Sequence, residues 1–169
     1  MPTHENLNLT ADAIPSVLLV ILWLGILYTA RSSGRRIAML SLGGTIGHEA
    51  LHAAIGWILG AKPTSFTIVP KKEGNRWVLG SVGFTNLNIW NSAPVAFAPL
   101  LLVGIAWLTF RFWMQPAFLV GQYLSWLISS YFVAACLFSC IPSSTDIKVG
   151  ALSGLMYGSV GYLLWTIAR

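Results

Sequence analysis

Residues 37–61 read IAMLSLGGTIGHEALHAAIGWILGA, an apolar block that contains the polar run His48-Glu49-Ala50-Leu51-His52. Arg36 precedes the block and Lys62 follows it. The block is long enough to cross a bilayer as a helix, which needs about 20 apolar residues. Because ionisable side chains are costly inside a membrane, three of them in the middle of such a block indicate a functional site.

The composition of the whole chain is typical of a membrane protein. Of its 169 residues, 56% are hydrophobic and only 9% are charged, whereas a soluble domain carries about 25% charged residues. These values exclude an ordinary soluble domain, a disordered chain and a nucleic-acid-binding module. The net charge is +5, but the basic residues are scattered, and we interpret them as anchors at the membrane interface. We therefore expect an integral, multi-pass membrane protein in contact with the lipid bilayer.

Charged residues divide the sequence into apolar segments, which we interpret as transmembrane helices. After a polar tail at 1–12, the predicted spans are 13–30, 37–61, 93–110, 116–140 and 149–168. Between the second and third spans, 63–86 holds two β-rich stretches around the turn-forming residues 70–75, which predicts a β-hairpin at the membrane surface. The expected fold is an all-α polytopic membrane bundle of about five transmembrane helices with a short β-hairpin, in one domain. Lys and Arg divide evenly between the two sides, so the positive-inside rule gives no orientation.

The polar run in the second span is an H-E-x-x-H motif. On a helix, positions i and i+4 share a face, so the imidazoles of His48 and His52 can bind one Zn²⁺ ion. The ion lowers the pKa of a water molecule, and Glu49 is placed to accept its proton as general base. The alternative is that these residues pack across helices through hydrogen bonds, which suits one polar residue better than three at ligand spacing.

A catalytic zinc ion usually has three protein ligands, so one more ligand is expected. Glu73 is one candidate, but it lies in Lys71-Lys72-Glu73-Gly74-Asn75-Arg76, which reads most simply as a solvated turn. Asp146 is the other; it ends the charge-free stretch 112–145 and precedes the last predicted span. Its alternative role is that of an N-cap or first-turn acid of that helix. We favour ligation by Asp146.

Two series of residues at intervals of four suggest how the second and fifth spans meet. The series are Gly44, His48, His52, Gly56 and Gly60, and Asp146, Gly150, Gly154 and Gly158. Residues four apart form one ridge on a helix, and glycine lets helix backbones approach closely in a membrane. We expect the two ridges to face each other and close the metal site. The alternative is that the three glycines of the second series form a face through which the chain makes a homo-oligomer.

These features resemble the site-2 protease family, the intramembrane zinc metalloproteases. The resemblance rests on the early H-E-x-x-H span, the hairpin-like segment after it and a late segment with Pro and Asp, and it covers residues 37–150. The late motif of the family is N-x-x-P followed by D-G. Here Pro142 and Asp146 are present, but Ser139 stands in place of the Asn and Ile147 in place of the Gly. The chain is thus similar to a divergent, minimal member.

The resemblance implies a zinc metalloendopeptidase with His48, His52 and Asp146 as ligands and Glu49 as base. Its substrate would be a membrane protein, cut in or near a transmembrane segment. Such a site has to line a polar cavity, because the bilayer core contains no water. A helical substrate has to unwind before attack, and we expect an edge of the hairpin near Val82 to hold the unwound segment by β-augmentation.

Other functional classes fit the residues less well. An intramembrane aspartyl protease needs two membrane aspartates, a Ser–His type needs a membrane histidine outside the metal motif, and a di-iron oxygenase needs more than three histidines. Two alternatives stay open. A catalytically inactive zinc-binding scaffold or regulator of membrane partners would not need Glu49, and a metal-ion carrier would need further acidic residues along a pathway.

Overall fold

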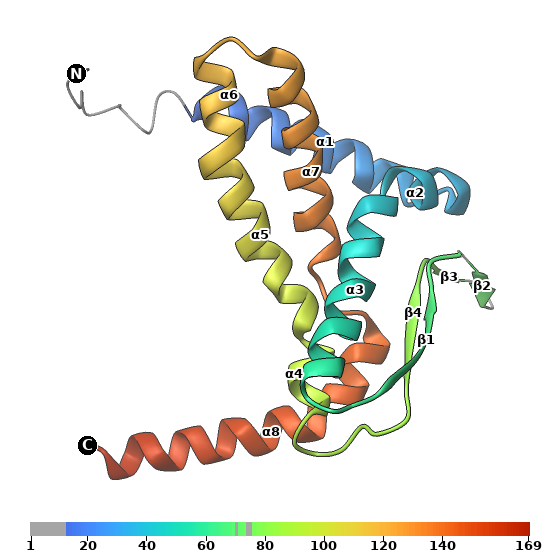
Figure 1. Ribbon diagram of the computed structural model, residues 1–169, viewed down its shortest axis with the longest axis vertical. Helices are drawn as coiled ribbons and strands as arrows, with labels where there is room; N and C mark the ends of the chain where they lie inside the picture. Colours follow the sequence, from blue (N-terminus) through green and yellow to red (C-terminus); the bar gives the residue numbers. More distant parts are fainter. Residues whose placement is uncertain (1–12, 70, 74–75) are drawn as a thin grey trace. The chain divides into compact units, whose positions relative to one another are not determined.

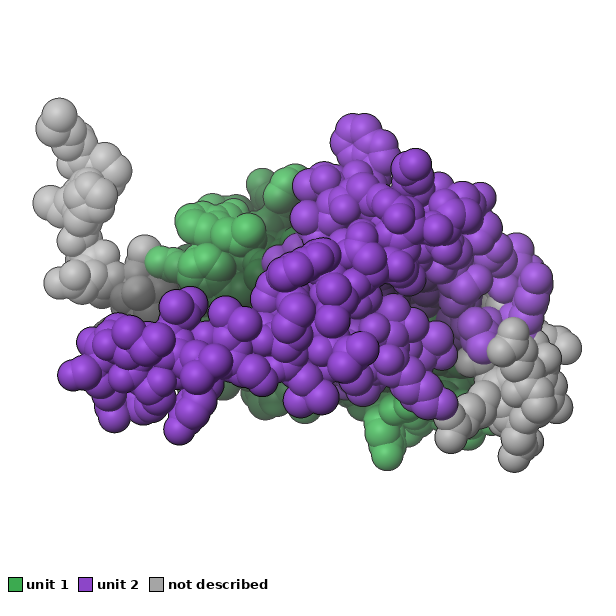
Figure 2. Space-filling view, turned by 90° about the horizontal axis from the view of Figure 1, so that it is seen from below, with its two compact units in different colours: residues 1–44, 102–138 green, residues 45–101, 139–169 purple. Residues whose placement is uncertain are grey.

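The chain folds into helices that are joined, in its first half, by a hairpin of short strands (Figure 1). The computed structural model describes residues 13–69, 71–73 and 76–169. These residues form two units, shown in different colours in Figure 2. The first unit comprises 1–44 and 102–138, and the second comprises 45–101 and 139–169. The mostly helical fold and the small antiparallel β element confirm that part of the predicted class.

The first unit is built around hydrogen bonds between helices. Its elements are α1 (Ile14–Ala30), α2 (Gly34–Leu40), most of α5 (Leu101–Thr109), the π-helical turn η2 (Phe110–Met114), α6 (Gln115–Leu119) and most of α7 (Tyr123–Ser139). The indole N–H groups of Trp23 and Trp126 donate to Ser130 Oγ and Ser16 Oγ at 3.0 and 2.9 Å. Both serines are fully buried, so α1 and α7 are joined by polar contacts of the kind that hold helices together in lipid.

The second unit contains the predicted motif and the hairpin. Its elements are most of α3 (Leu42–Ile58), β1 (Pro63–Thr67), β2 (Lys71–Glu73), β3 (Arg76–Val78), β4 (Ser81–Phe84), α4 (Ser92–Ala96), the 3₁₀ turn η1 (Ala98–Leu100) and α8 (Ser144–Ile167). After α3, Gly60 has a φ of 69° and the N–H of Ala61 returns to the carbonyl of Gly56 at 2.7 Å. This is the glycine-dependent Schellman end of a helix, and it turns the chain into β1.

The β-hairpin predicted at 63–86 is present. β1 pairs antiparallel with β4, with Phe66 opposite Val82, and β2 pairs antiparallel with β3. Each pair is a two-stranded sheet, without a third strand in the described part of the chain. The ring of Phe84 lies against Gly56, which places the end of β4 on α3.

The predicted boundary between the third and fourth spans is wrong. Instead of ending at 110 and restarting at 116, the helical segment Ala98–Leu119 continues past Arg111. The Arg111 side chain is exposed and its Nη1 donates to Gln115 Oε1 at 3.4 Å, so this charge does not end the helix. The π-helical turn, in which Gln115 N–H bonds to the Phe110 carbonyl, makes room for the proline at 116. The chain reverses later, at Gly121, which has a φ of 74°.

Two further predicted spans have different limits. The block 37–61 is not one helix, because α2 ends at Leu40 and α3 begins after Ser41. The last helix, predicted at 149–168, begins five residues earlier at Ser144, so that Asp146 is inside its first turn. Both limits matter for the site, because α3 carries the H-E-x-x-H motif and α8 carries the aspartate.

Two described helices are long and apolar enough to cross a membrane, namely Ala98–Leu119 and Ser144–Ile167. Ile14–Ala30 and Tyr123–Ser139 are apolar but shorter. In α8 only Gly150 and Ser153 are buried, and large apolar side chains such as Leu155 (70% exposed) face outward along the helix. These helices make the protein a candidate membrane protein, and five crossings remain a prediction.

Candidate metal centre

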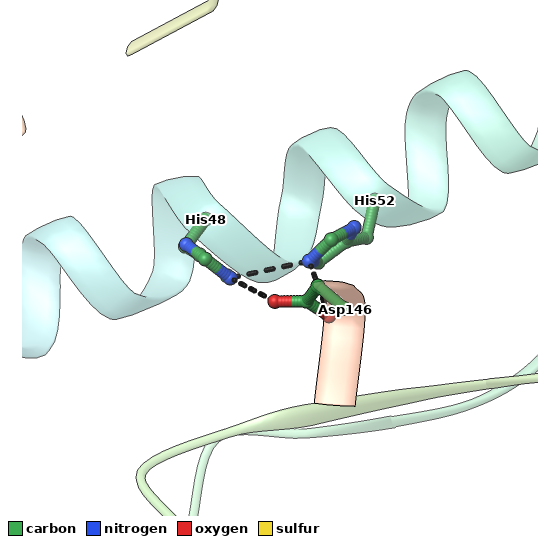
Figure 3. A group of neighbouring side chains, drawn as sticks. All are labelled: His48, His52 and Asp146. Atoms are coloured by element: carbon green, nitrogen blue, oxygen red, sulfur yellow. Dashed lines mark hydrogen bonds and ion pairs between the residues drawn. The ribbon is translucent and has the colours of Figure 1, made fainter. Parts of the chain in front are cut away.

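The structure brings His48, His52 and Asp146 together within the second unit (Figure 3). The two imidazoles project from successive turns of α3, with their Nε2 atoms 3.1 Å apart. Asp146 reaches them from the first turn of α8, with Oδ2 at 3.5 Å from His48 Nε2 and Oδ1 at 3.3 Å from His52 Nε2. The three residues predicted as ligands from the sequence are therefore neighbours in the fold.

Backbone carbonyls determine which ring nitrogen of each histidine carries the proton. His48 Nδ1 lies 2.6 Å from the carbonyl oxygen of Ser139, and His52 Nδ1 lies 2.7 Å from that of Val95. Because a carbonyl oxygen only accepts hydrogen bonds, each Nδ1 has to donate an N–H. In the neutral tautomer each Nε2 then carries a lone pair, as in histidines that bind metals and are oriented through the other nitrogen.

The three side chains fit a small divalent metal ion. Two Nε2 lone pairs and a carboxylate converge on one point, and a cation there removes the repulsion between them. A tetrahedral zinc site with metal–ligand distances of about 2.0–2.1 Å separates its ligand atoms by about 3.3 Å. The two Nε2 atoms are 3.1 Å apart, each lies 3.3–3.5 Å from a different oxygen of the Asp146 carboxylate, and one ligand atom from each residue can be chosen so that all lie within 4.8 Å of one another. The group can therefore hold a metal ion, and two imidazoles with one carboxylate are a known donor set of catalytic zinc.

Asp146 is a first-turn acid of α8 and also belongs to the group that could hold a metal ion. Ser143 caps α8 by accepting the Asp146 N–H on its Oγ at 3.2 Å, and the Ser143 N–H donates to Asp146 Oδ2 at 2.6 Å. This capping box fixes the carboxylate in the orientation that faces the histidines. The rival ligand, Glu73, ends β2, and its side chain lies outside the described part of the structure.

Helix α4 holds α3 and α8 together at the site. Its Val95 carbonyl accepts the hydrogen bond from His52 on α3. At its other end, the N–H of Ala93 donates to the fully buried Ser153 Oγ of α8 at 3.1 Å. This serine satisfies one of the N–H groups that a helix start leaves without a partner. One short helix thereby positions both the second histidine and the helix that carries the aspartate.

The prediction that the two glycine ridges pack against each other is wrong. A Cβ placed on Gly150 would lie 2.7 Å from the Cβ of Ala96, so the α8 glycine allows close approach of α4. Gly56, on the α3 ridge, packs against the ring of Phe84 in β4. Gly56 thus faces the hairpin and Gly150 faces α4, and the members of the two ridges that lie together are His48, His52 and Asp146.

Glu49 is buried beside the ligands, and the link between β3 and β4 passes against it. Its side chain is 7% exposed. A Cβ added to Gly80 in this link would lie 2.7 Å from Glu49 Cγ and 2.9 Å from Oε1. The absence of a side chain at Gly80 therefore leaves the space in which the Glu49 carboxylate sits.

Three contributors to this site were not predicted from the sequence. Val95 and Ser139 act through their backbone carbonyls, which no residue type reveals, and Gly80 acts by lacking a side chain. The signal that could have found the two carbonyls is a proline a few residues after each one, at Pro99 and Pro142. At Ser139 the main chain contributes to the orientation of a histidine.

No protein-family model, curated protein or solved structure matches this chain.

Proposed function

We propose that the protein is an intramembrane zinc metalloprotease that hydrolyses a peptide bond in or near a transmembrane segment of a membrane-protein substrate. The observation that carries the proposal is the convergence of His48 Nε2, His52 Nε2 and the Asp146 carboxylate. Glu49 follows the first histidine on the same helix and is buried beside this group. Two imidazoles, a carboxylate and an adjacent acid are the groups that zinc-dependent peptide hydrolysis requires.

The residues of the site have distinct roles. His48, His52 and Asp146 would hold the ion, which supplies Lewis-acid activation of a water molecule and of the scissile carbonyl. Glu49 accepts the proton of the attacking water. It then returns that proton to the amide nitrogen that leaves when the C–N bond breaks. One water is consumed, and its second proton passes from the new carboxyl group to the new amine, so that a carboxylate and an ammonium group are formed.

The surroundings of the site support a membrane-protein substrate. Helix α8, which carries Asp146, exposes apolar side chains over most of its length. A lipid bilayer would cover these side chains without a further protein partner. The β1–β4 sheet has two strands, and an unwound substrate segment can add to an edge of it. Gly80, in the link between β3 and β4, packs against the side chain of Glu49.

A catalytically inactive zinc-binding scaffold or regulator is the alternative. It would need the ligands and their carbonyl partners, but it would not need a buried acid beside them. The space left for Glu49 at Gly80 favours the enzyme.

The proposal is tested by metal analysis and cleavage together. The chain purified in detergent is expected to contain about one zinc ion, and His52→Ala is expected to lose it, because a zinc site rarely holds with two protein ligands. The wild type reconstituted in vesicles is expected to cut at least one of a panel of single-span membrane proteins. Zinc in the wild type without any cleavage would favour the scaffold, and no bound zinc would contradict both.

A further inference from the structure

The carbonyl that orients His52 lacks its usual helical partner. In an α-helix the carbonyl of residue i accepts the N–H of residue i+4. Four residues after Val95 is Pro99, which has no N–H. α4 ends at Ala96, and the chain continues as the 3₁₀ turn that contains the fully buried Pro99. The Val95 carbonyl therefore has no i+4 donor, and besides the N–H of Phe97 at the helix end it accepts His52 Nδ1, at 2.7 Å.

The carbonyl that orients His48 is kept available in a similar way. Ser139 is the last residue of α7, and three residues later, where a tighter turn would place a donor, the chain has Pro142. The residue four positions later is Ser143, whose N–H is taken by Asp146 Oδ2 at 2.6 Å. Pro142 has no N–H, and the N–H of Ser143 is already bonded to Asp146. The Ser139 carbonyl therefore accepts the hydrogen bond from His48 Nδ1 at 2.6 Å.

We infer that Pro99 and Pro142 are positioning residues of the metal centre. Each removes a backbone donor, and a carbonyl is thereby kept for one histidine. That carbonyl holds the proton on Nδ1, which turns the Nε2 lone pair toward the metal. The inference rests on the proposed zinc site. It assigns a role to two residues that touch neither the metal nor the substrate.

The test is the affinity of the purified protein for Zn²⁺, measured by competition with a chelator. Pro99→Ala supplies an N–H that competes with His52 for the Val95 carbonyl. We expect the Kd to rise about 10- to 100-fold, the usual effect of losing an outer-shell partner of a ligand. Pro94→Ala is the matched control, because this exposed proline is at the third position of α4, where a helix N–H has no carbonyl to compete for.

A double-mutant cycle separates positioning from a general folding defect. If Pro99 acts through His52, then Pro99→Ala has little further effect, less than about twofold, on the weak Zn²⁺ affinity left in a His52→Ala variant, which loses the ion on purification and is titrated with Zn²⁺ in excess. In a His48→Ala variant it keeps its full effect. Pro142→Ala is expected to show the reverse pattern, with its effect lost in His48→Ala.

Equal loss in both histidine backgrounds, or an unchanged Kd in Pro99→Ala, would overturn the inference. A wild-type protein that does not bind Zn²⁺ would instead overturn the proposed function on which the inference rests.

Discussion

Two hydrogen bonds to backbone carbonyls give His48 and His52 the same tautomer and aim both Nε2 atoms at Asp146. The identity of these three residues was readable in the sequence, because ligand types at i and i+4 are rare in an apolar block unless they bind something. The two carbonyls that orient the histidines could not be predicted from the sequence, since every residue has a backbone carbonyl. Their availability depends on where helices end, which spacing alone does not fix.

Gly80 provides a prediction for a single residue. Gly80→Ala places a methyl group within 2.7 Å of Glu49 Cγ, and the carboxylate has to move. We expect kcat/KM for a cleaved substrate to fall about 100-fold, the cost of misplacing a catalytic group by about 1 Å. Zinc content should stay that of the wild type, because none of the three ligands is touched.

The matched control for this change is Gly158→Ala, at a position where a Cβ meets nothing within 4 Å. It should leave both cleavage and zinc unchanged. Full activity in Gly80→Ala would show that the hairpin link does not hold the base in place.

Among the helices and strands, the packing of α8 on α4 places Asp146 at the site. The hairpin after α3 followed from β-rich stretches on either side of a turn, and its outline could be predicted. The glycine ridges were assigned to the wrong neighbours, because a glycine series shows that something approaches closely but not which element does. Arg111 does not mark a membrane boundary, because its long side chain can extend away from an apolar helix that continues from Ala98 to Leu119.

Gly150→Ala tests this packing. The added Cβ would lie 2.7 Å from that of Ala96, so α4 and α8 have to separate. Overpacking of this kind destabilises a protein by about 1–3 kcal/mol. We expect a lower Tm and weaker zinc retention, since Asp146 is one helical turn away. Differential scanning fluorimetry and metal analysis measure the two effects.

Gly154→Ala is a milder companion, because its Cβ would make an ordinary 3.7 Å contact with Phe97. It should bind zinc like the wild type. Wild-type zinc retention in both variants would show that the α4–α8 contact does not position the aspartate.

For the molecule as a whole, composition and hydropathy predicted a helical membrane protein. The structure supplies two helices that are long enough to cross and two shorter apolar ones. The number of crossings was not readable from the helices alone, since α2 and α3 divide the block that carries the motif.

Five crossings make a prediction for cysteine labelling. In a background without Cys136 and Cys140, cysteines at Ser32 and Val120 should react with a membrane-impermeant maleimide from the same side of sealed vesicles. A cysteine at Thr85 should react only from the other side. Reaction of all three from one side would contradict a crossing by the segment that contains the motif.

The proposed function depends above all on Glu49 acting as the base of a zinc peptidase. A direct comparison of wild type and Glu49→Gln, an isosteric change, would measure zinc content and cleavage of the same single-span substrate in vesicles. We expect equal zinc in both proteins and a loss of cleavage of about 100-fold or more in Glu49→Gln, within the usual contribution of a general base. Equal cleavage by the two proteins would contradict this role of Glu49.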